Sequence, residues 1–391
     1  MSRIVTFFLL VALGLSAQAQ RYRHSLNFRF SKRHFVEVVP IEFQNDKIYV
    51  TLYMEGRPYR FNLDTGAGQG VIYLNGRVPY RAVLGRNVMT DANNRRDSVT
   101  VVALPDFQLG SLAVSGYPVQ MIRRRNIQTG VDGILGFDLF TKGMAAVIDV
   151  VNGLLILTDL EDELDGYGGY TLKYKLIGGT PHVRVSPFDN LKDDVIFDTG
   201  CRDFYLMSKQ TFDKGMTYER DFETQVESIT YGQAFIGSLG AAERLGEVAF
   251  LDFDDFRWAN YSFQRVRSIT LQGQSLMGTG ILKKGAMMID PFRHTLTFLP
   301  YEASIGALVD NQVHDIYYIP DHQGRPTVGL VRPGSEYDRL GFRSGDLVVS
   351  VNNRSTPTLG SFINCGFVNG RRYTYLLQET SGRMKTIDRL Y

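Results

Sequence analysis

Two Asp-Thr-Gly tripeptides are the residues of this sequence best suited to do chemistry. They occupy Asp64–Gly66 and Asp198–Gly200, each directly after an apolar run. An aspartate at the end of a buried strand enters a low-dielectric crevice, where two carboxylates placed together cannot both ionise easily. The pair then shares one proton, so that one carboxylate can take a proton from a trapped water while the other protonates a carbonyl oxygen. The pattern favours amide hydrolysis by Asp64 and Asp198 without a covalent intermediate.

The other residues of the two tripeptides have predicted supporting roles. Gly66 and Gly200 let the backbone turn tightly and bring N–H groups close to the carboxylates. Thr65 and Thr199 carry hydroxyls that can bond the opposite half of the chain and hold both loops in register. We therefore expect the two loops to build one site.

An internal repeat supports this pairing. Phe61–Gly66 matches Val195–Gly200, and further matches follow in the same order with modest insertions. They are Tyr73-Leu74 with Tyr205-Leu206, Val102–Phe107 with Val248–Phe253, Ile134–Gly136 with Leu276–Gly278, and Ile148-Asp149 with Ile289-Asp290. Duplication is the economical explanation, and a pseudo-twofold arrangement of the halves would place Asp64 against Asp198.

The elements that must position these residues are predicted to be mainly β-strands. Short runs rich in Val, Ile, Tyr and Phe alternate with Gly, Asn and Asp from residue 35 to residue 300, and long helical periodicity is nearly absent. An acidic and Gly-rich stretch over 159–169 is predicted to be an unpacked linker between lobes at 20–158 and 170–301. The predicted strands include Lys47–Tyr53, Pro58–Leu63, Val99–Leu104, Val147–Val151, Leu154–Leu157 and Asp194–Phe197.

These residues carry a family resemblance. Asp64–Ala67, Ile134–Gly136 and their second copies resemble the aspartic proteases, and the retropepsin-like proteins of bacteria more closely than the pepsins. The resemblance covers about residues 35–300 and implies two pseudo-symmetric β-barrel-like lobes, with each apolar-apolar-Gly element beneath an active-site loop. It also implies Asp64 and Asp198 as the catalytic pair of an endopeptidase that acts on polypeptides without a cofactor or a metal.

Two residues depart from the pattern of pepsin-like lobes. Those lobes usually carry Ser or Thr directly after Asp-Thr-Gly, whereas this chain has Ala67 and Cys201. A thiol is a weak donor, so we expect a pair less acid-shifted than that of pepsin and activity at weakly acidic to neutral pH. Cys201 as a nucleophile is the rival hypothesis, but no histidine lies near it in the sequence.

The resemblance further implies a substrate-covering hairpin, or flap, in each lobe. Gly85–Val101, with the polar tip Asp91–Asn94, fits the first flap, although it lacks the tyrosine that pepsins place there. Ile229–Val248 fits the second. Ordinary surface hairpins are the alternative interpretation of both segments.

The character of the sequence changes from about Asn311. Val328–Val331, Pro333–Ser335, Gly345-Asp346 and Leu347–Val351 together resemble a PDZ domain, here over 311–391. The resemblance implies that a peptide or protein ligand adds to a sheet edge of this module. The alternative is a structural appendage that packs on the rest of the chain.

Export is predicted from the first 19 residues. Arg3 precedes the apolar run Ile4–Leu15 and the small-x-small pattern Ala17–Ala19, which is typical of a signal peptide at 1–19. The run is too short to span a bilayer, and no later segment approaches the required length of about 20 residues. We expect an exported periplasmic or extracellular protein without a membrane span.

Composition and charge exclude other classes. Lys plus Arg, at 43, nearly equals Asp plus Glu, at 41, so nucleic acid is not an expected partner. The 6 histidines do not fall at zinc-ligand spacings, and 2 cysteines cannot form a disulfide framework. A non-catalytic peptide-binding receptor or scaffold remains the second hypothesis. Two intact copies of Asp-Thr-Gly argue against it, because a cleft that only binds needs neither aspartate.

Overall fold

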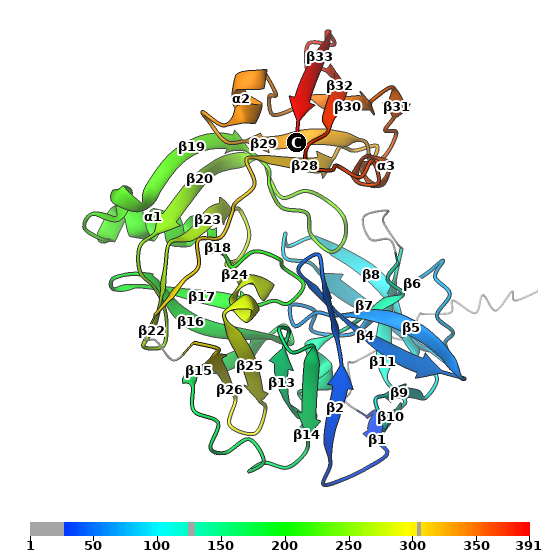
Figure 1. Cartoon of the computed structure of the whole chain (residues 1–391). Helices are drawn as coiled ribbons and strands as arrows, with labels where there is room; N and C mark the ends of the chain where they lie inside the picture. The colour runs from blue at the N-terminus through cyan, green and yellow to red at the C-terminus, as the bar shows by residue number, and fades with distance from the viewer. Residues whose placement is uncertain (1–26, 124–129, 303–305) are drawn as a thin grey trace, which may run out of the picture.

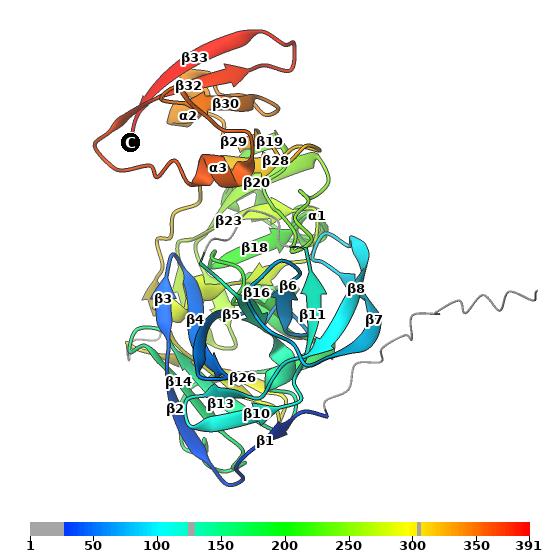
Figure 2. The same cartoon turned by 90° about the vertical axis from the view of Figure 1, so that its right-hand side faces the viewer.

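The computed structural model describes residues 27–123, 130–302 and 306–391, so the predicted signal peptide at 1–19 lies outside the described residues. The chain is mainly β, as predicted, and its strands form sheets of 11, 16 and 6 strands. Figures 1 and 2 show the 6-stranded sheet at one end of the molecule, beside β19 and β20 and far from β1 and β2. No helix in the described ranges is both long and apolar enough to cross a bilayer.

The 11-stranded sheet is built from the first part of the chain. Its strands β4 and β5 form a hairpin that ends directly before Asp64, and β7 and β8 form the predicted first flap. The strands are β1 (Arg29–Phe30), β3 (Glu42–Gln44), β4 (Lys47–Met54), β5 (Arg57–Leu63), β6 (Val71–Tyr73), β7 (Ala82–Thr90), β8 (Arg96–Ala103), β9 (Phe107–Leu109), β10 (Leu112–Ser115), β11 (Pro118–Ile122) and β12 (Gly133–Leu135).

The 16-stranded sheet joins strands from both halves of the repeat. β13 pairs with β25, and β2 from the start of the chain pairs with β14. The strands are β2 (Val36–Pro40), β13 (Ala145–Asp149), β14 (Leu154–Thr158), β15 (Tyr170–Ile177), β16 (Thr180–Phe188), β17 (Leu191–Phe197), β18 (Tyr205–Ser208), β19 (Val226–Gly232), β20 (Gly246–Phe253), β21 (Phe256–Trp258), β22 (Tyr261–Gln264), β23 (Val266–Leu271), β24 (Leu276–Met277), β25 (Gly285–Asp290), β26 (Thr295–Pro300) and β27 (Gly306–Leu308).

The C-terminal sheet has the order β28-β29-β30-β32-β33, with β31 beside β30. Its strands are β28 (Ile316–Pro320), β29 (Pro326–Val331), β30 (Leu347–Val351), β31 (Arg354–Ser355), β32 (Arg372–Gln378) and β33 (Met384–Leu390). The helical segments of the chain are α1 (Lys209–Tyr218), α2 (Glu336–Leu340), α3 (Leu359–Ile363), η1 (Phe137–Leu139), η2 (Phe222–Gln225) and η3 (Thr279–Lys283). Helix α1 was not predicted from the sequence; it begins where Ser208 Oγ accepts the Thr211 N–H at 3.1 Å.

The two large sheets are open, which corrects the expectation of barrel-like lobes. Over the described residues, each strand order has two ends, and one end of each sheet is a strand of a predicted flap, β7 in the first sheet and β19 in the second. Closure would require the end strands to pair with each other.

The strand pairing repeats between the halves. β12 lies parallel to β5 and antiparallel to β6, and β24 has the same relations to β17 and β18. The match of Ile134–Gly136 with Leu276–Gly278 is thus confirmed. The pairing equates Val71 with Leu206 and Val102 with Leu251, so the predicted matches of Tyr73 with Tyr205 and Val102 with Val248 are wrong in register. Apolar alternation repeats along a strand and does not fix which residue pairs with which.

The pseudo-twofold axis passes between β13 and β25. Val147 pairs with Met288, and the flanking pairs Ala146–Ile289 and Ile148–Met287 exchange with each other when the halves are swapped. Leu164 is 5% exposed and packs in the same cluster as Val147 and Met288. This corrects the prediction that the stretch 159–169 is unpacked, because one leucine among its charged residues reaches the apolar groups at the axis.

Candidate functional site

Equivalent elements place the two predicted aspartates. Asp64 follows β5 and donates its backbone N–H to Leu135 O of β12 at 3.0 Å. Asp198 follows β17 and donates its backbone N–H to Met277 O of β24 at 2.8 Å. Beyond each apolar strand, Phe137 N donates to Ala67 O at 2.7 Å, and the equivalent Thr279 N donates to Cys201 O at 3.0 Å. Each apolar-apolar-Gly element therefore supports the loop that follows its aspartate.

The two aspartate side chains, called the aspartate pair below, lie within hydrogen-bonding reach of each other. A Cβ atom built on Gly66 would lie 2.3 Å from Cγ of Asp198, and one built on Gly200 would lie 2.5 Å from Cγ of Asp64. Each glycine of one half therefore contacts the carboxyl group of the other half. No side chain fits at either glycine without displacing the opposite aspartate.

Backbone donors surround the aspartate pair. Asp64 Oδ1 accepts the N–H groups of Gly66 at 3.0 Å and Ala67 at 3.1 Å, and Asp198 Oδ1 accepts the Gly200 N–H at 2.7 Å. Both aspartates keep partial exposure to solvent. Burial and the neighbouring Asp198 carboxylate raise the pKa of Asp64 from 3.8 to about 8. Asp64 therefore keeps its proton through neutral pH.

Thr65 and Thr199 lock the two loops together, as predicted. Thr65 N donates to Thr199 Oγ1 and Thr199 N donates to Thr65 Oγ1, both at 3.0 Å. Each hydroxyl in turn donates across the interface, from Thr65 to Phe197 O at 2.6 Å and from Thr199 to Leu63 O at 2.7 Å. Both threonines are completely buried, so the four bonds are shielded from water.

Ala67 and Cys201 occupy the equivalent positions after the tripeptides. Ala67 contributes only its backbone N–H to Asp64. The Cys201 Sγ lies 3.9 Å from Oδ2 of Asp203, and no described hydrogen bond joins this thiol to Asp198. Burial raises the pKa of Cys201 well above its ordinary value, which keeps the thiol protonated and a poor nucleophile.

Hairpins from each half reach across to the loop of the other half. A Cβ on Gly68 would lie 2.5 Å from Gly178 O in the turn between β15 and β16. In the equivalent turn between β3 and β4, Asp46 O accepts a hydrogen bond from Thr279 Oγ1 at 2.8 Å. Lys47 follows this turn, and its ammonium opposes the rise in the pKa of Asp64. This role of Lys47 was not predicted from the sequence, because only the fold brings Lys47 near Asp64.

The predicted flaps meet each other. Residues 233–245, which connect β19 to β20 and are called the strap below, contact the tip of the first flap. Asp91 Oδ2 accepts the Leu239 N–H at 3.3 Å, and Asn93 Nδ2 donates to Ala241 O at 3.0 Å. Asp91 is 6% exposed and also accepts the N–H groups of Asn93 and Arg95 within its own turn. The strap and the flap tip thus form a bridge between the halves.

The C-terminal unit, residues 311–391, contacts both the strap and the loop that follows Asp198. Gln233 N donates to Gly329 O of β29 at 2.9 Å. Leu330 is completely buried and shares a cluster with Cys201, and Val313 and Tyr317 pack with the same cluster. This unit is therefore packed onto the elements that surround the aspartate pair.

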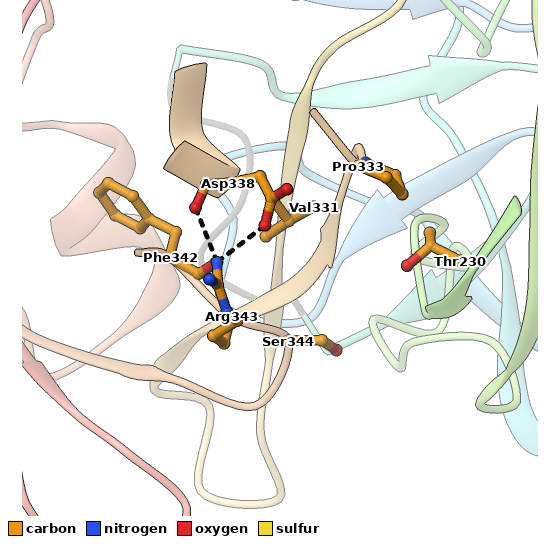
Figure 3. A pocket seen from close by; sticks show the side chains of 7 residues that line it. All are labelled: Thr230, Val331, Pro333, Asp338, Phe342, Arg343 and Ser344. Atoms are coloured by element: carbon orange, nitrogen blue, oxygen red, sulfur yellow. Dashed lines mark hydrogen bonds and ion pairs between the residues drawn. The ribbon is translucent and has the colours of Figure 1, made fainter. Parts of the chain in front are cut away.

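A hollow of about 280 Å³ lies at this junction, away from the aspartate pair (Figure 3). Thr230 of β19 lies on one side and Asp338 and Arg343 of the C-terminal unit on the other. Arg343 Nη1 donates to the backbone oxygen and to Oδ1 of Asp338, both at 2.8 Å, so its charge is already paired. None of the predicted site residues lines this hollow.

No group of three or more His, Cys, Asp and Glu side chains with the arrangement of a metal site occurs within the described ranges. The aspartate pair itself offers two carboxyl groups and backbone N–H donors. In this geometry a water between the carboxyl groups could lose a proton to one while the other donates a proton.

Comparisons with known proteins give structural neighbours only. No family model matches the chain, and no curated protein matches it. The chain is similar to the crystal structure of basic 7S globulin from soybean, with a TM-score of 0.40 and 11% identity over 68% of this chain and 94% of that one. It is also similar to the aspartic proteinase from Irpex lacteus, with a TM-score of 0.44 and 14% identity over 68% of this chain and 97% of that one.

Proposed function

We propose that the chain is an aspartic endopeptidase that hydrolyses peptide bonds in polypeptides. The observation that carries the proposal is the aspartate pair, in which two equivalent loops bring two carboxyl groups within hydrogen-bonding reach. One carboxylate acts as the general base towards a water molecule, and the protonated partner donates to the carbonyl oxygen of the scissile bond. Backbone N–H groups on both loops hold the carboxyl groups in place.

The symmetric support of the pair favours a catalytic role over simple peptide binding. A cleft that only binds extended chains needs neither two carboxyl groups placed together nor a shared proton, and bringing two carboxyl groups together costs folding free energy. This close placement of two carboxyl groups is maintained by the hydroxyl bonds of Thr65 and Thr199 and by the glycines that contact the opposite aspartates. The receptor or scaffold hypothesis gives no reason for it.

The C-terminal unit and the compartment complete the proposal. β28 ends the 6-stranded sheet, and an extended peptide or protein segment could add to this edge in a PDZ-like manner. We assign the unit at 311–391 this role, with lobes at 20–158 and 170–301, and we place the mature protein in the periplasm or outside the cell on the strength of residues 1–19.

The direct test is incubation of the purified protein with an unstructured protein at pH 5 to 8, with and without pepstatin, followed by mass spectrometry of the products. Time-dependent internal cleavage that pepstatin blocks is the expected result. Binding of the unstructured protein without any new peptide over the whole pH range would instead support the receptor or scaffold hypothesis.

A further inference from the structure

A buried carboxyl group lies beneath the loop that follows Asp64. Asp138 belongs to η1 and is 1% exposed. Tyr117, which is completely buried, donates its hydroxyl hydrogen to Asp138 Oδ1 at 2.6 Å. The Tyr117 ring is held by edge contacts with Phe28 at 5.0 Å and Phe107 at 5.8 Å between ring centroids. Asp138 and Tyr117 therefore form a rigid structural support from which water is excluded.

The loop from Gly66 to Gly70 packs directly on this support. A Cβ on Gly136 would lie 2.9 Å from Asp138 Oδ1 and 2.7 Å from Ala67 O, so the carboxyl group and the loop are separated by one backbone layer. The Gly70 N–H donates to Asp138. A Cβ on Gly70 would lie 2.8 Å from the Tyr117 ring. The loop thus begins at Asp64 and ends on a hydrogen bond to Asp138.

The second half has no equivalent group. The pairing of β12 with β5 and of β24 with β17 equates Asp138 with Gly280. A Cβ on Gly280 would lie 2.5 Å from Cα of Phe204, so the second half has no room for a side chain there. The support is a special feature of the Asp64 loop and not a general requirement of the repeated fold.

We propose that Asp138 is a positioning residue for the aspartate pair, acting through the Gly66–Gly70 loop. By accepting the Gly70 N–H and the Tyr117 hydroxyl, its carboxylate fixes the end of the loop, and the loop fixes the Gly66 and Ala67 N–H groups that hold Asp64. The role of Asp138 in catalysis rests on the proposed endopeptidase function. Its role in holding the loop does not.

The charge of Asp138 gives this role a pH dependence. Burial raises the pKa of Asp138 to about 7, while bonds from Tyr117 and from backbone N–H groups oppose the rise. Tyr117 is the titratable group that faces it from the segment before β11, and the loop before β6 presents the Gly70 N–H. Above this pKa the carboxylate accepts both bonds at full strength, and below it the neutral acid is a weaker acceptor.

The test compares the full chain with D138N and with a matched control, D193N. Asp193 is also buried and also accepts a tyrosine hydroxyl, from Tyr205 at 2.6 Å, but it lies on β17 with Thr211 as its second partner. Losing a charged acceptor costs about tenfold in equilibrium or rate. D138N should therefore lower kcat about tenfold with KM little changed, whereas D193N should lower stability and leave kcat within about twofold.

Hydrogen exchange of the amides in 66–70 provides a readout that needs no activity. Corrected for intrinsic rates, exchange of the Gly70 amide in the wild type should rise as the pH falls through about 7, near the pKa of Asp138, and should be faster but pH-independent in D138N. If the wild type cleaves nothing, the endopeptidase proposal fails while the exchange data still decide the positioning role.

An unchanged kcat and unchanged exchange in D138N would overturn the inference, and so would an equal loss of kcat in D193N. If D138N does not fold, Y117F takes its place, because it removes one donor and keeps the carboxylate. An activity loss of about three- to fivefold in Y117F supports the role, and wild-type activity contradicts it.

Discussion

At the scale of residues, the site is a set of reciprocal contacts across a pseudo-twofold axis. Each threonine hydroxyl bonds the opposite strand end, and each glycine contacts the opposite aspartate. Each aspartate is thus held by backbone N–H groups of its own loop and contacted by the glycine of the other half. A carboxyl pair that would otherwise repel is kept together by the neighbours and by a shared proton.

Thr65→Val and Thr199→Val test the reciprocal bonds. Each change keeps the volume but leaves a buried backbone N–H and a buried carbonyl without their partner, which costs about 1–3 kcal/mol for each unsatisfied group. We expect each variant to lose about 2–4 kcal/mol of unfolding free energy in urea denaturation. A loss below about 0.5 kcal/mol in either variant would show that the hydroxyls are not structural.

The raised pKa of Asp64 sets the alkaline limit of activity. The mechanism needs one protonated and one ionised carboxyl group, and the pKa of Asp64 is about 8. Activity should therefore persist through neutral pH and fall as the pH rises through about 8, when the pair loses its last proton. A profile of kcat/KM against pH checks this, and a steep loss of activity as the pH rises from 5 to 7 would contradict it.

The residues of the pair and its supports could be predicted from the sequence, because they belong to two short repeated segments. The roles of Lys47 and Asp138 could not, since each reaches the site from a distant part of the chain. Asp91 was expected at the flap tip, but its contact with the strap could not be predicted. Asp138 had the only local signal, its position two residues after Gly136. A single aspartate at that position does not by itself indicate a buried support for the Asp64 loop.

At the scale of elements, the positions of the strands could be predicted from the sequence more readily than their pairing and register. The predicted strands are present because β-branched and aromatic runs between turn residues are a local signal. The register of β6 against β18, the open sheet ends and α1 were missed, because they depend on tertiary pairing. The contact between the first flap and the strap could not be predicted either, since nothing in the sequence of one segment indicates that it contacts the other.

Asp91→Ala tests the bridge between the flap tip and the strap. The change removes the acceptor of the Leu239 N–H and of two turn N–H groups. We expect hydrogen exchange in 235–243 and 89–95 to rise at least about tenfold, the effect of losing about 1.4 kcal/mol of local stability. Asp97→Ala, an exposed position on β8 of the same hairpin, is the control and should leave exchange unchanged. Equal protection in Asp91→Ala and the wild type would mean that the bridge is not maintained in solution.

At the scale of the whole molecule, the C-terminal unit is a part of the site's surroundings. Its Leu330 shares a buried cluster with Cys201, and its Gly329 accepts a hydrogen bond from the strap. The unit therefore packs against residues that surround Asp198 and against the strap that contacts the flap tip. The two sequence interpretations of the unit, ligand binding and structural packing, are compatible in this arrangement.

Leu330→Ala tests this coupling. The side chain is completely buried between the C-terminal unit and the second half, and truncation of a buried leucine costs about 2–5 kcal/mol. Trp258, the only tryptophan of the chain, lies in the second half and reports its unfolding by fluorescence. We expect the Trp258 transition to shift to lower denaturant. An unchanged Trp258 transition, with an earlier separate loss of circular dichroism, would show that the two parts unfold independently.

The measurement that tests the central claim most directly is the initial rate of cleavage of an unstructured protein by the wild type, Asp64→Asn and Asp198→Asn at pH 6. Asparagine removes the charge and the shared proton but almost no volume, so both variants should remain folded, with unfolding transitions at least as stable as that of the wild type. General acid–base groups contribute about 10²–10⁴-fold each, so both variants should lose at least that much activity. Cleavage at the wild-type rate by either folded variant would contradict the account.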